Sequence, residues 1–167
     1  SNHAGQIASA AAVRELIRES KLIDTSARVQ DAYSFRCAPQ VIGAARDAIA
    51  YARRIVEEEI NAATDNPLIF LDVPDENKTR SGGNFHGEAI ALAMDFLGIA
   101  VAEIANISER RIFRLTSAHL NDGLPMMLVE NGGQNSGLMM AQVTAAALVS
   151  DNKTLTHPDS VDSIPTS

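Results

Sequence analysis

The amino-acid sequence predicts an all-α fold, a bundle of long antiparallel helices. Tryptophan is absent and aromatic residues make up only 4% of the 167 residues, which favours close-packed helices over a sheet rich in aromatic and β-branched side chains. Three long segments have the apolar spacing of helices, and polar or glycine-rich loops join them. With 46% hydrophobic residues, we expect residues 1–167 to form a single helical segment with one core.

The central predicted element is a long helix that follows a glycine-rich turn at 82–87 and ends near Leu115. Four residues interrupt its apolar run 89–107: Asp95, Gly98, Glu103 and Asn106. A helix that is apolar on nearly every face is typically buried. We expect no membrane span, because each carboxylate would cost ~3 kcal/mol at the centre of a bilayer.

The other helices are predicted on either side of this one. Apolar residues recur at helical spacing in 7–19, in 39–63, where Pro39 suits the first turn, and in 136–154. The Glu57–Glu59 run is expected to be a solvated face or a set of ion-pair partners for Arg53 and Arg54, four residues earlier.

The connecting segments are predicted to be mostly irregular. Residues 21–36 lose helical periodicity and form a polar and aromatic loop. Pro67 ends the preceding helix, and 68–70 can only be a short extended piece. Residues 75–80 are expected to be an exposed loop, and glycines and a proline break up 116–133.

Charge and cysteine content exclude several classes of function. A net charge of -7 and a pI near 5.0 argue against nucleic-acid binding. The single cysteine, Cys37, cannot form an intrachain disulfide, and the start of the chain lacks a charged and apolar signal segment, so we expect a cytoplasmic protein. His86 and Glu88 have the His-x-Glu spacing of zinc deaminases, but no Pro-Cys-x-x-Cys accompanies them, and we expect no metal site.

Candidate binding residues occur in two patterns. Gln30, Tyr33 and Arg36 are spaced at three-residue intervals, so a helical turn would place an amide, a phenol and a guanidinium along one side; the alternative is an arginine paired with a surface carboxylate. The glycine-rich turns 82–84 and 132–137 each precede a helix whose free N–H groups could bind an anion. Neither has the Gly-Lys-Ser/Thr of a phosphate-binding loop or follows a strand, and such a pattern alone is more often a tight turn.

Several sequence strings resemble the histidine and aromatic amino-acid ammonia-lyases, in that family's order. They are Gln-Asp-Ala-Tyr-Ser-Phe-Arg (30–36), Asp-Asn-Pro-Leu (65–68), Ser-Gly-Gly-Asn-Phe-His-Gly (81–87), Ser-Glu-Arg-Arg (108–111) and Asn-Ser-Gly (135–137). Residues 141–148 and 160–167 resemble the histidine branch in particular. The resemblance implies helical homotetramers whose active sites are assembled from several subunits, and it covers the middle and later part of a longer chain.

The resemblance also implies a reaction. The family's electrophile is a methylidene-imidazolone (MIO) made from an internal Ala-Ser-Gly, and residues 1–167 contain no Ala-Ser-Gly. In the intact enzyme this group would allow L-histidine to lose ammonia and a β-proton, giving trans-urocanate. We therefore expect the 167-residue segment alone to be inactive. The alternatives are a phenylalanine or tyrosine ammonia-lyase, an aminomutase of the same family, or a helical assembly module without catalytic function.

Roles for five residues follow from the same resemblance. Arg36 resembles the arginine that binds the substrate carboxylate, for which its planar donor fork is suited. Tyr33 resembles the phenol beside the substrate and prosthetic group, and Gln30 the amide that hydrogen-bonds near it. Phe85 resembles the aromatic residue packed against the imidazolone, and Met139 a pocket residue near the substrate ring.

Overall fold

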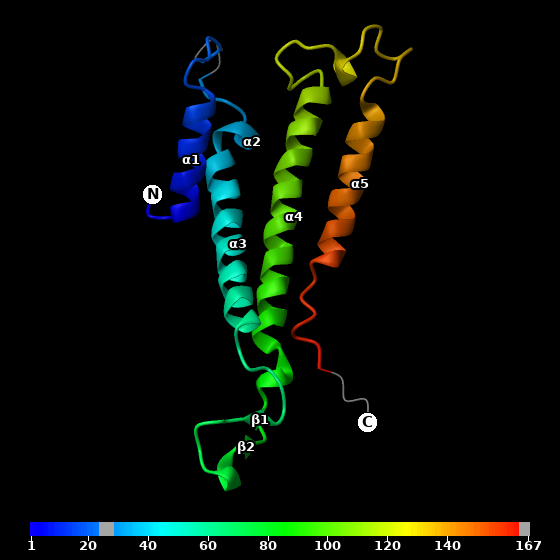
Figure 1. The fold of residues 1–167 in the computed structure, drawn as a ribbon. Helices are drawn as coiled ribbons and strands as arrows, with labels where there is room; N and C mark the ends of the chain where they lie inside the picture. Colours follow the sequence, from blue (N-terminus) through cyan, green and yellow to red (C-terminus); the bar gives the residue numbers. More distant parts are fainter. Residues whose placement is uncertain (24–28, 164–167) are drawn as a thin grey trace.

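The computed structural model describes residues 1–23 and 29–163. The longest helices of this part are α1 (Ala4–Leu16), α3 (Ala38–Ile60), α4 (Glu88–Thr116) and α5 (Met139–Leu155). They lie side by side in the order α1, α3, α4, α5, and each runs antiparallel to its neighbour (Figure 1). The predicted all-α class with long antiparallel helices is confirmed, and the helices form an open row.

Shorter elements lie at the two ends of this row. One helical turn, α2 (Tyr33–Arg36), and a 3₁₀ turn, η3 (Met126–Leu128), lie at the end where α4 finishes. At the opposite end, β1 (Leu68–Ile69) pairs antiparallel with β2 (Thr79–Arg80), and the hairpin leads to η2 (Asn84–His86) at the start of α4 (Figure 1). We call these the upper end and the lower end, as they appear in Figure 1.

The short elements refine the sequence predictions for the loops. The extended piece predicted at 68–70 is confirmed as β1, and the Phe70 N–H donates to the Lys78 carbonyl to continue the hairpin. The polar segment 75–80 contains η1 (Asp75–Asn77) and β2 as well as loop. Of the loop predicted at 21–36, residues 24–28 lie outside the described residues, and the prediction was wrong at its end, because α2 is helical there.

Several helix boundaries differ from the predicted ones, including the end of the first helix at Leu16 instead of residue 19. The first helix begins at Ala4, before the predicted residue 7, and the Gly5 N–H donates to the Asp47 carboxylate of α3 at 2.7 Å. The second ends at Ile60 before residue 63, and the Asn61 side chain hydrogen-bonds the Glu57 carbonyl. The last begins at Met139 instead of 136, since Gly137 has a positive φ of 51°.

Small residues form the buried contacts between the helices. Ala45 and Ala48 of α3 pack with Ala100 of α4, and Ile104 covers this cluster. Where α1 crosses α3, a Cβ at Gly5 or Gly43 would overlap backbone atoms of the other helix. Glycine therefore permits an approach that larger residues would prevent.

In one copy of the chain much of α4 is exposed, so the burial expected from its apolar sequence requires other copies to cover it. Ala93 is fully buried, but Leu92, Phe96 and Val101 are 49%, 47% and 52% exposed. In the open row, α3 and α5 cover only part of the surface of α4. By length and composition, 84–116 is also long and apolar enough to cross a membrane, a test that the core helix of a soluble protein and a signal sequence pass as well.

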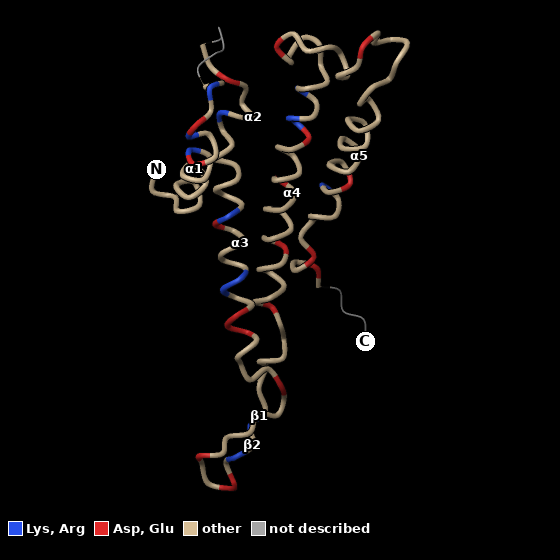
Figure 2. Tube along the Cα trace, turned by 45° about the horizontal axis from the view of Figure 1, so that its top comes forward, with Lys and Arg blue, Asp and Glu red and all other residues tan. Residues whose placement is uncertain are grey.

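Charged side chains lie on both long central helices, α3 and α4. The predicted ion pairs on α3 are confirmed: Arg53 contacts Glu57 at 2.7 Å and Arg54 contacts Glu58 at 2.8 Å. Figure 2 shows these charges along α3, while most of α4 below its last turns is uncharged. Exposed apolar residues of α4 occur from Leu92 to Val101, on either side of Asp95.

Candidate functional site

The turn α2 carries two of the predicted site residues. Tyr33 begins the turn and Arg36 ends it, and the Arg36 guanidinium lies 5.4 Å from the centroid of the Tyr33 ring. This distance is within the range of a cation–π contact. Gln30 precedes the helical turn and is exposed, so the predicted alignment of three side chains applies to Tyr33 and Arg36 but not to Gln30.

A pocket of about 420 Å³ lies between α2 and the second half of α4. Tyr33 is the one predicted site residue that lines it; its other walls are apolar residues of α3, α4 and the following loop together with polar residues of α4. The apolar walls include Val41, Ile107, Phe113 and Leu120. An apolar pocket with a few polar groups is the usual form of a small-molecule site.

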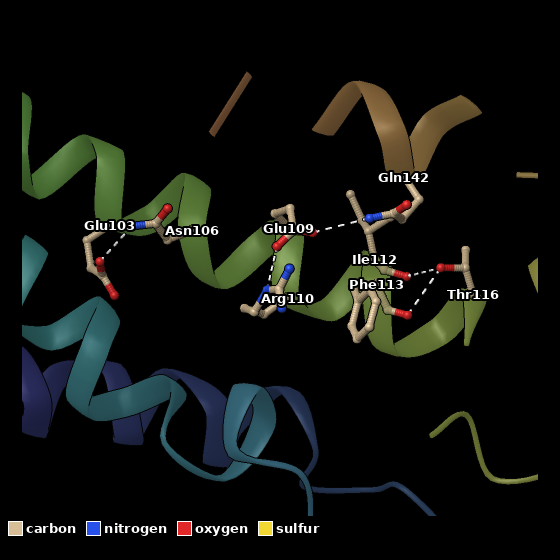
Figure 3. A network of polar contacts seen from close by, with 8 residues as sticks. All are labelled: Glu103, Asn106, Glu109, Arg110, Ile112, Phe113, Thr116 and Gln142. Atoms are coloured by element: carbon tan, nitrogen blue, oxygen red, sulfur yellow. Dashed lines mark hydrogen bonds and ion pairs between the residues drawn. The ribbon is translucent and has the colours of Figure 1, made fainter. Parts of the chain in front are cut away.

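Two interruptions of the apolar run form a polar wall of this pocket. The Asn106 side-chain amide donates to the Glu103 carboxylate at 2.9 Å, and both residues line the cavity (Figure 3). Their positions on α4 follow from helical spacing, since residues three apart share a face.

A buried carboxylate lies one turn further along α4. Glu109 is 4% exposed and accepts a hydrogen bond from the Arg110 Nε, and the Gln142 amide of α5 lies 3.5 Å from its other oxygen (Figure 3). A buried charge requires such partners because its transfer from water is costly. The hydrogen bond to Glu109 raises the pKa of the Arg110 guanidinium above its usual range.

The next arginine reaches in another direction. The Nε of Arg111 donates to the Ser34 carbonyl of α2 at 3.0 Å, and its guanidinium lies 6.0 Å from the centroid of the Phe35 ring. Arg111 therefore binds the turn that carries Tyr33 and Arg36. Arg110 instead lies 4.8 Å from the centroid of the Phe113 ring on its own helix.

Met139 lies at the upper end as well, as the first residue of α5 and 38% exposed. The loop before it is conformationally constrained: every non-glycine residue with positive φ in the described ranges falls between 122 and 131, including Met127 and Leu128. The Met127 carbonyl accepts the Leu138 N–H at 3.0 Å, which fixes the start of α5. Such conformations persist only where the surrounding structure holds them.

Phe85 lies at the lower end, in η2 before α4, and is 60% exposed. The 29 residues of α4 span about 43 Å at 1.5 Å per residue. One copy of the chain therefore brings Tyr33, Arg36 and Met139 to the same end of the row, and it does not bring Phe85 to them.

The glycine-rich turn beside Phe85 is explained by its own hydrogen bonds. The Asn66 side-chain oxygen accepts from the Gly82 N–H and the Ser81 hydroxyl, both at 3.0 Å. Gly87 has a φ of 78°, a left-handed conformation that favours glycine. These contacts support the tight-turn interpretation. Among residues 1–23 and 29–163, no group of three or more His, Cys, Asp or Glu side chains could hold a metal ion.

Sequence reasoning assigned no role to the polar residues of α4 that build the upper end. These are Glu103, Asn106, Glu109, Arg110 and Arg111. A signal for the first two was present, because they interrupt an apolar run. Glu109 and Arg111 belong to the Ser-Glu-Arg-Arg string, but only the tertiary structure shows which neighbours they contact.

Comparison with known proteins gives consistent results along the whole chain. The family model described as "Aromatic amino acid lyase" matches residues 1–167. The histidine ammonia-lyase of Caldanaerobacter subterraneus subsp. tengcongensis is 63% identical over 99% of this chain. The match covers 32% of that relative, so the chain spans about a third of the length of the curated relatives it matches.

Solved structures share the fold. The crystal structure of histidine ammonia-lyase from Trypanosoma cruzi is 51% identical, with a TM-score of 0.87, over 99% of this chain and 30% of that one. The tyrosine aminomutase of Streptomyces globisporus has the same TM-score at 37% identity, over 99% of this chain and 35% of its own.

Proposed function

Because the chain belongs to the aromatic amino acid lyase family, we propose that it is the middle and later part of an enzyme that eliminates ammonia from L-histidine to give trans-urocanate. The observation that carries this proposal is the 63% identity to a histidine ammonia-lyase over 99% of this chain. Similarity to a tyrosine aminomutase is lower, at 37%. The two activities share a scaffold, and identity favours histidine.

The upper end supplies the substrate-binding side chains in this proposal. Arg36 binds the carboxylate of the amino acid with two parallel N–H groups, as its planar fork allows. Tyr33 lies beside it on the same turn and lines the adjacent pocket. Met139 borders the substrate ring, and Gln30 donates or accepts a hydrogen bond near Tyr33. The location of Tyr33, Arg36 and Met139 at one end of the row supports this assignment.

The prosthetic group of the family fits the aromatic residues of this chain. Tyr33 and Phe85 are 74% and 60% exposed, so each has a ring face free to contact a planar group held by another part of the protein. Bound there, a methylidene-imidazolone supplies the electrophile that the elimination requires. It would come from outside residues 1–167, which lack Ala-Ser-Gly.

A site that uses both Tyr33 and Phe85 requires more than one copy of the chain. The length of α4 separates the two residues within one copy, and its exposed apolar residues offer a surface on which other copies can pack. We therefore propose that copies of the chain assemble, in the homotetramer that the family resemblance implies. The single cysteine supports a cytoplasmic location for it. Light scattering on the 167-residue chain at micromolar concentration should detect self-association, and a monodisperse monomer would contradict the packing argument.

The activity test uses the intact enzyme. Purified protein should form urocanate from L-histidine, measured by ultraviolet absorbance, and should act on L-phenylalanine and L-tyrosine far more slowly. Faster loss of ammonia from L-phenylalanine or L-tyrosine would favour a phenylalanine or tyrosine ammonia-lyase. Formation of a β-amino acid would favour an aminomutase. A purified intact protein without activity on any of the three amino acids would favour the non-catalytic assembly module.

A further inference from the structure

Two residues of the Ser-Glu-Arg-Arg string point toward different elements. Glu109 and Arg111 are two positions apart on α4, and each residue of a helix advances by about 100°, so their side chains leave the helix about 200° apart. Glu109 faces Gln142 of α5 and Arg111 faces Ser34 of α2. The two elements held in this way carry Met139 on one side and Tyr33 with Arg36 on the other.

The contact on the α2 side is made to the backbone. Arg111 donates to the carbonyl of Ser34, which lies between Tyr33 and Arg36 in sequence, and its guanidinium lies over the ring of Phe35. A charged donor on a backbone carbonyl fixes the position of the turn without depending on the identity of the Ser34 side chain. The turn has only four residues, so its own hydrogen bonds hold it weakly.

The contact on the α5 side involves a buried charge. Glu109 is nearly inaccessible to solvent, and Gln142 is one helical turn after Met139. Loss of the Gln142 amide would leave Oε1 of Glu109 without this neighbouring donor, while Arg110 would still donate to Oε2. The start of α5 would then lose its polar link to α4.

We propose that Glu109 and Arg111 are positioning residues that hold the substrate-binding turn α2 and the ring-binding end of α5 on opposite sides of α4. Neither is a catalytic residue, since each acts through another element. This inference rests on the proposed function, because the roles of Arg36 and Met139 define what is being positioned. It assigns separate consequences to the two sides: Arg111 affects recognition of the carboxylate, and Glu109 with Gln142 affects recognition of the ring.

The test compares variants of the intact enzyme. Arg111→Met should reduce kcat/KM for L-histidine by roughly tenfold, as expected for loss of one charge-assisted hydrogen bond. The affinity for histamine, which lacks the carboxylate, should change much less. Arg111→Lys keeps a donor and should recover part of the loss. Arg53→Met is the matched control, because it removes an exposed arginine of α3 with an ion pair to Glu57.

A double-mutant cycle separates positioning from general destabilisation. If Arg111 acts through Arg36, then Arg111→Met should cost much less in an Arg36→Lys background than in the wild type. On the other side, Gln142→Leu should weaken binding of histidine and histamine equally, because both ligands contain the imidazole ring. Two results would overturn the proposal. One is an equal loss of kcat/KM from Arg111→Met in the wild type and in the Arg36→Lys background, and the other is an equal loss of histidine and histamine affinity in Arg111→Met.

Failure of this inference differs from failure of the proposed function. If the wild-type enzyme forms urocanate and Arg111→Met behaves like Arg53→Met, the positioning role is wrong and the proposed function stands. If the wild-type enzyme does not act on histidine, the proposed function is wrong before any variant is made.

Discussion

The two ends of α4 are built differently. At the upper end, side chains of α4 contact α2 and α5, the following loop contains every non-glycine positive φ of the described residues, and an apolar pocket lies beside Tyr33. At the lower end, the hairpin and η2 are mostly exposed, and Phe85 presents its ring to solvent. The upper end is organised within one copy, whereas the lower end has few contacts to the other helices.

This difference indicates what each end requires from the rest of the protein. Residues that bind a polar substrate need neighbours that fix their positions. At the upper end, one copy of the chain supplies these neighbours. An aromatic residue that only packs against a planar group needs its partner to be brought to it. The comparison therefore predicts that the upper end acts as a preformed half-site and that the lower end completes a half-site of another copy.

The largest expected effect concerns the isolated 167-residue chain. We expect no urocanate formation from it, because binding residues cannot replace a missing covalent electrophile. Ultraviolet absorbance with the purified chain should not exceed that of a heat-treated sample. Activity above that level would show that both ends suffice without the remaining parts of the enzyme.

The next test asks whether the two ends serve one site from different copies. In the intact enzyme, Tyr33→Phe and Phe85→Ala should each be strongly impaired. Mixed tetramers of the two variants should regain roughly one quarter of the wild-type activity, because random mixing leaves about that share of sites with both native residues. Co-expression with two affinity tags and a urocanate assay measures this recovery. No recovery in verified mixed tetramers would mean that the residues do not share a site.

A third test sharpens the role of the upper end. Arg36→Lys keeps the charge and loses the two-pronged donor geometry, so kcat/KM for L-histidine should fall roughly ten- to a hundredfold, the equivalent of ~1.5 to 3 kcal/mol. Histamine binding should barely change. If Arg36 serves only a surface ion pair, the cost is ~0 to 1 kcal/mol of stability and catalysis is nearly unaffected.

Features that depend on local sequence spacing were predicted better than features that depend on contacts between distant segments. Helix class and order followed from apolar spacing, and the ion pairs of Arg53 and Arg54 followed from i, i+4 geometry. The exposure of α4 within one copy agrees with its sequence, because its apolar residues cover more faces than a three-helix unit of this size can bury, but the sequence does not show how many copies share the core. The contacts of Arg111 and Glu109 join residues far apart in sequence, which local patterns do not encode.

Helix ends were predicted less well for a similar reason. The start of α1 involves a bond from Gly5 to Asp47 of α3, and the start of α5 is set by the constrained loop at Met127. Both are tertiary contacts. Spacing singled out Gln30, Tyr33 and Arg36. Resemblance added Phe85 and Met139 and supplied the roles of all five, which stay predictions.

The smallest expected effect concerns Asp95, in the lower half of α4. Its Oδ2 accepts the Ser160 N–H at 2.8 Å, which ties the segment after α5 to α4. Hydrogen bonds from the Ser160 side chain and backbone hold the pKa of Asp95 below its usual value. The ionised form therefore stabilises this contact above the unfolded pKa of about 3.9, and the contact weakens as the pH falls through the lowered folded value.

Asp95→Asn keeps an acceptor and removes the charge. In the intact enzyme at pH 7, backbone amides of 157–163 should exchange with deuterium about two- to fivefold faster in this variant, because a charge-assisted hydrogen bond is roughly twice as strong as a neutral one. After correction for intrinsic exchange, the difference should persist down to about pH 4 and narrow below it, where the wild-type carboxyl also becomes neutral. Asp151→Asn, an exposed change on α5, serves as the control. A difference that disappears already near pH 6 would show that the charge of Asp95 does not hold this segment, since a lowered pKa keeps the carboxylate ionised there.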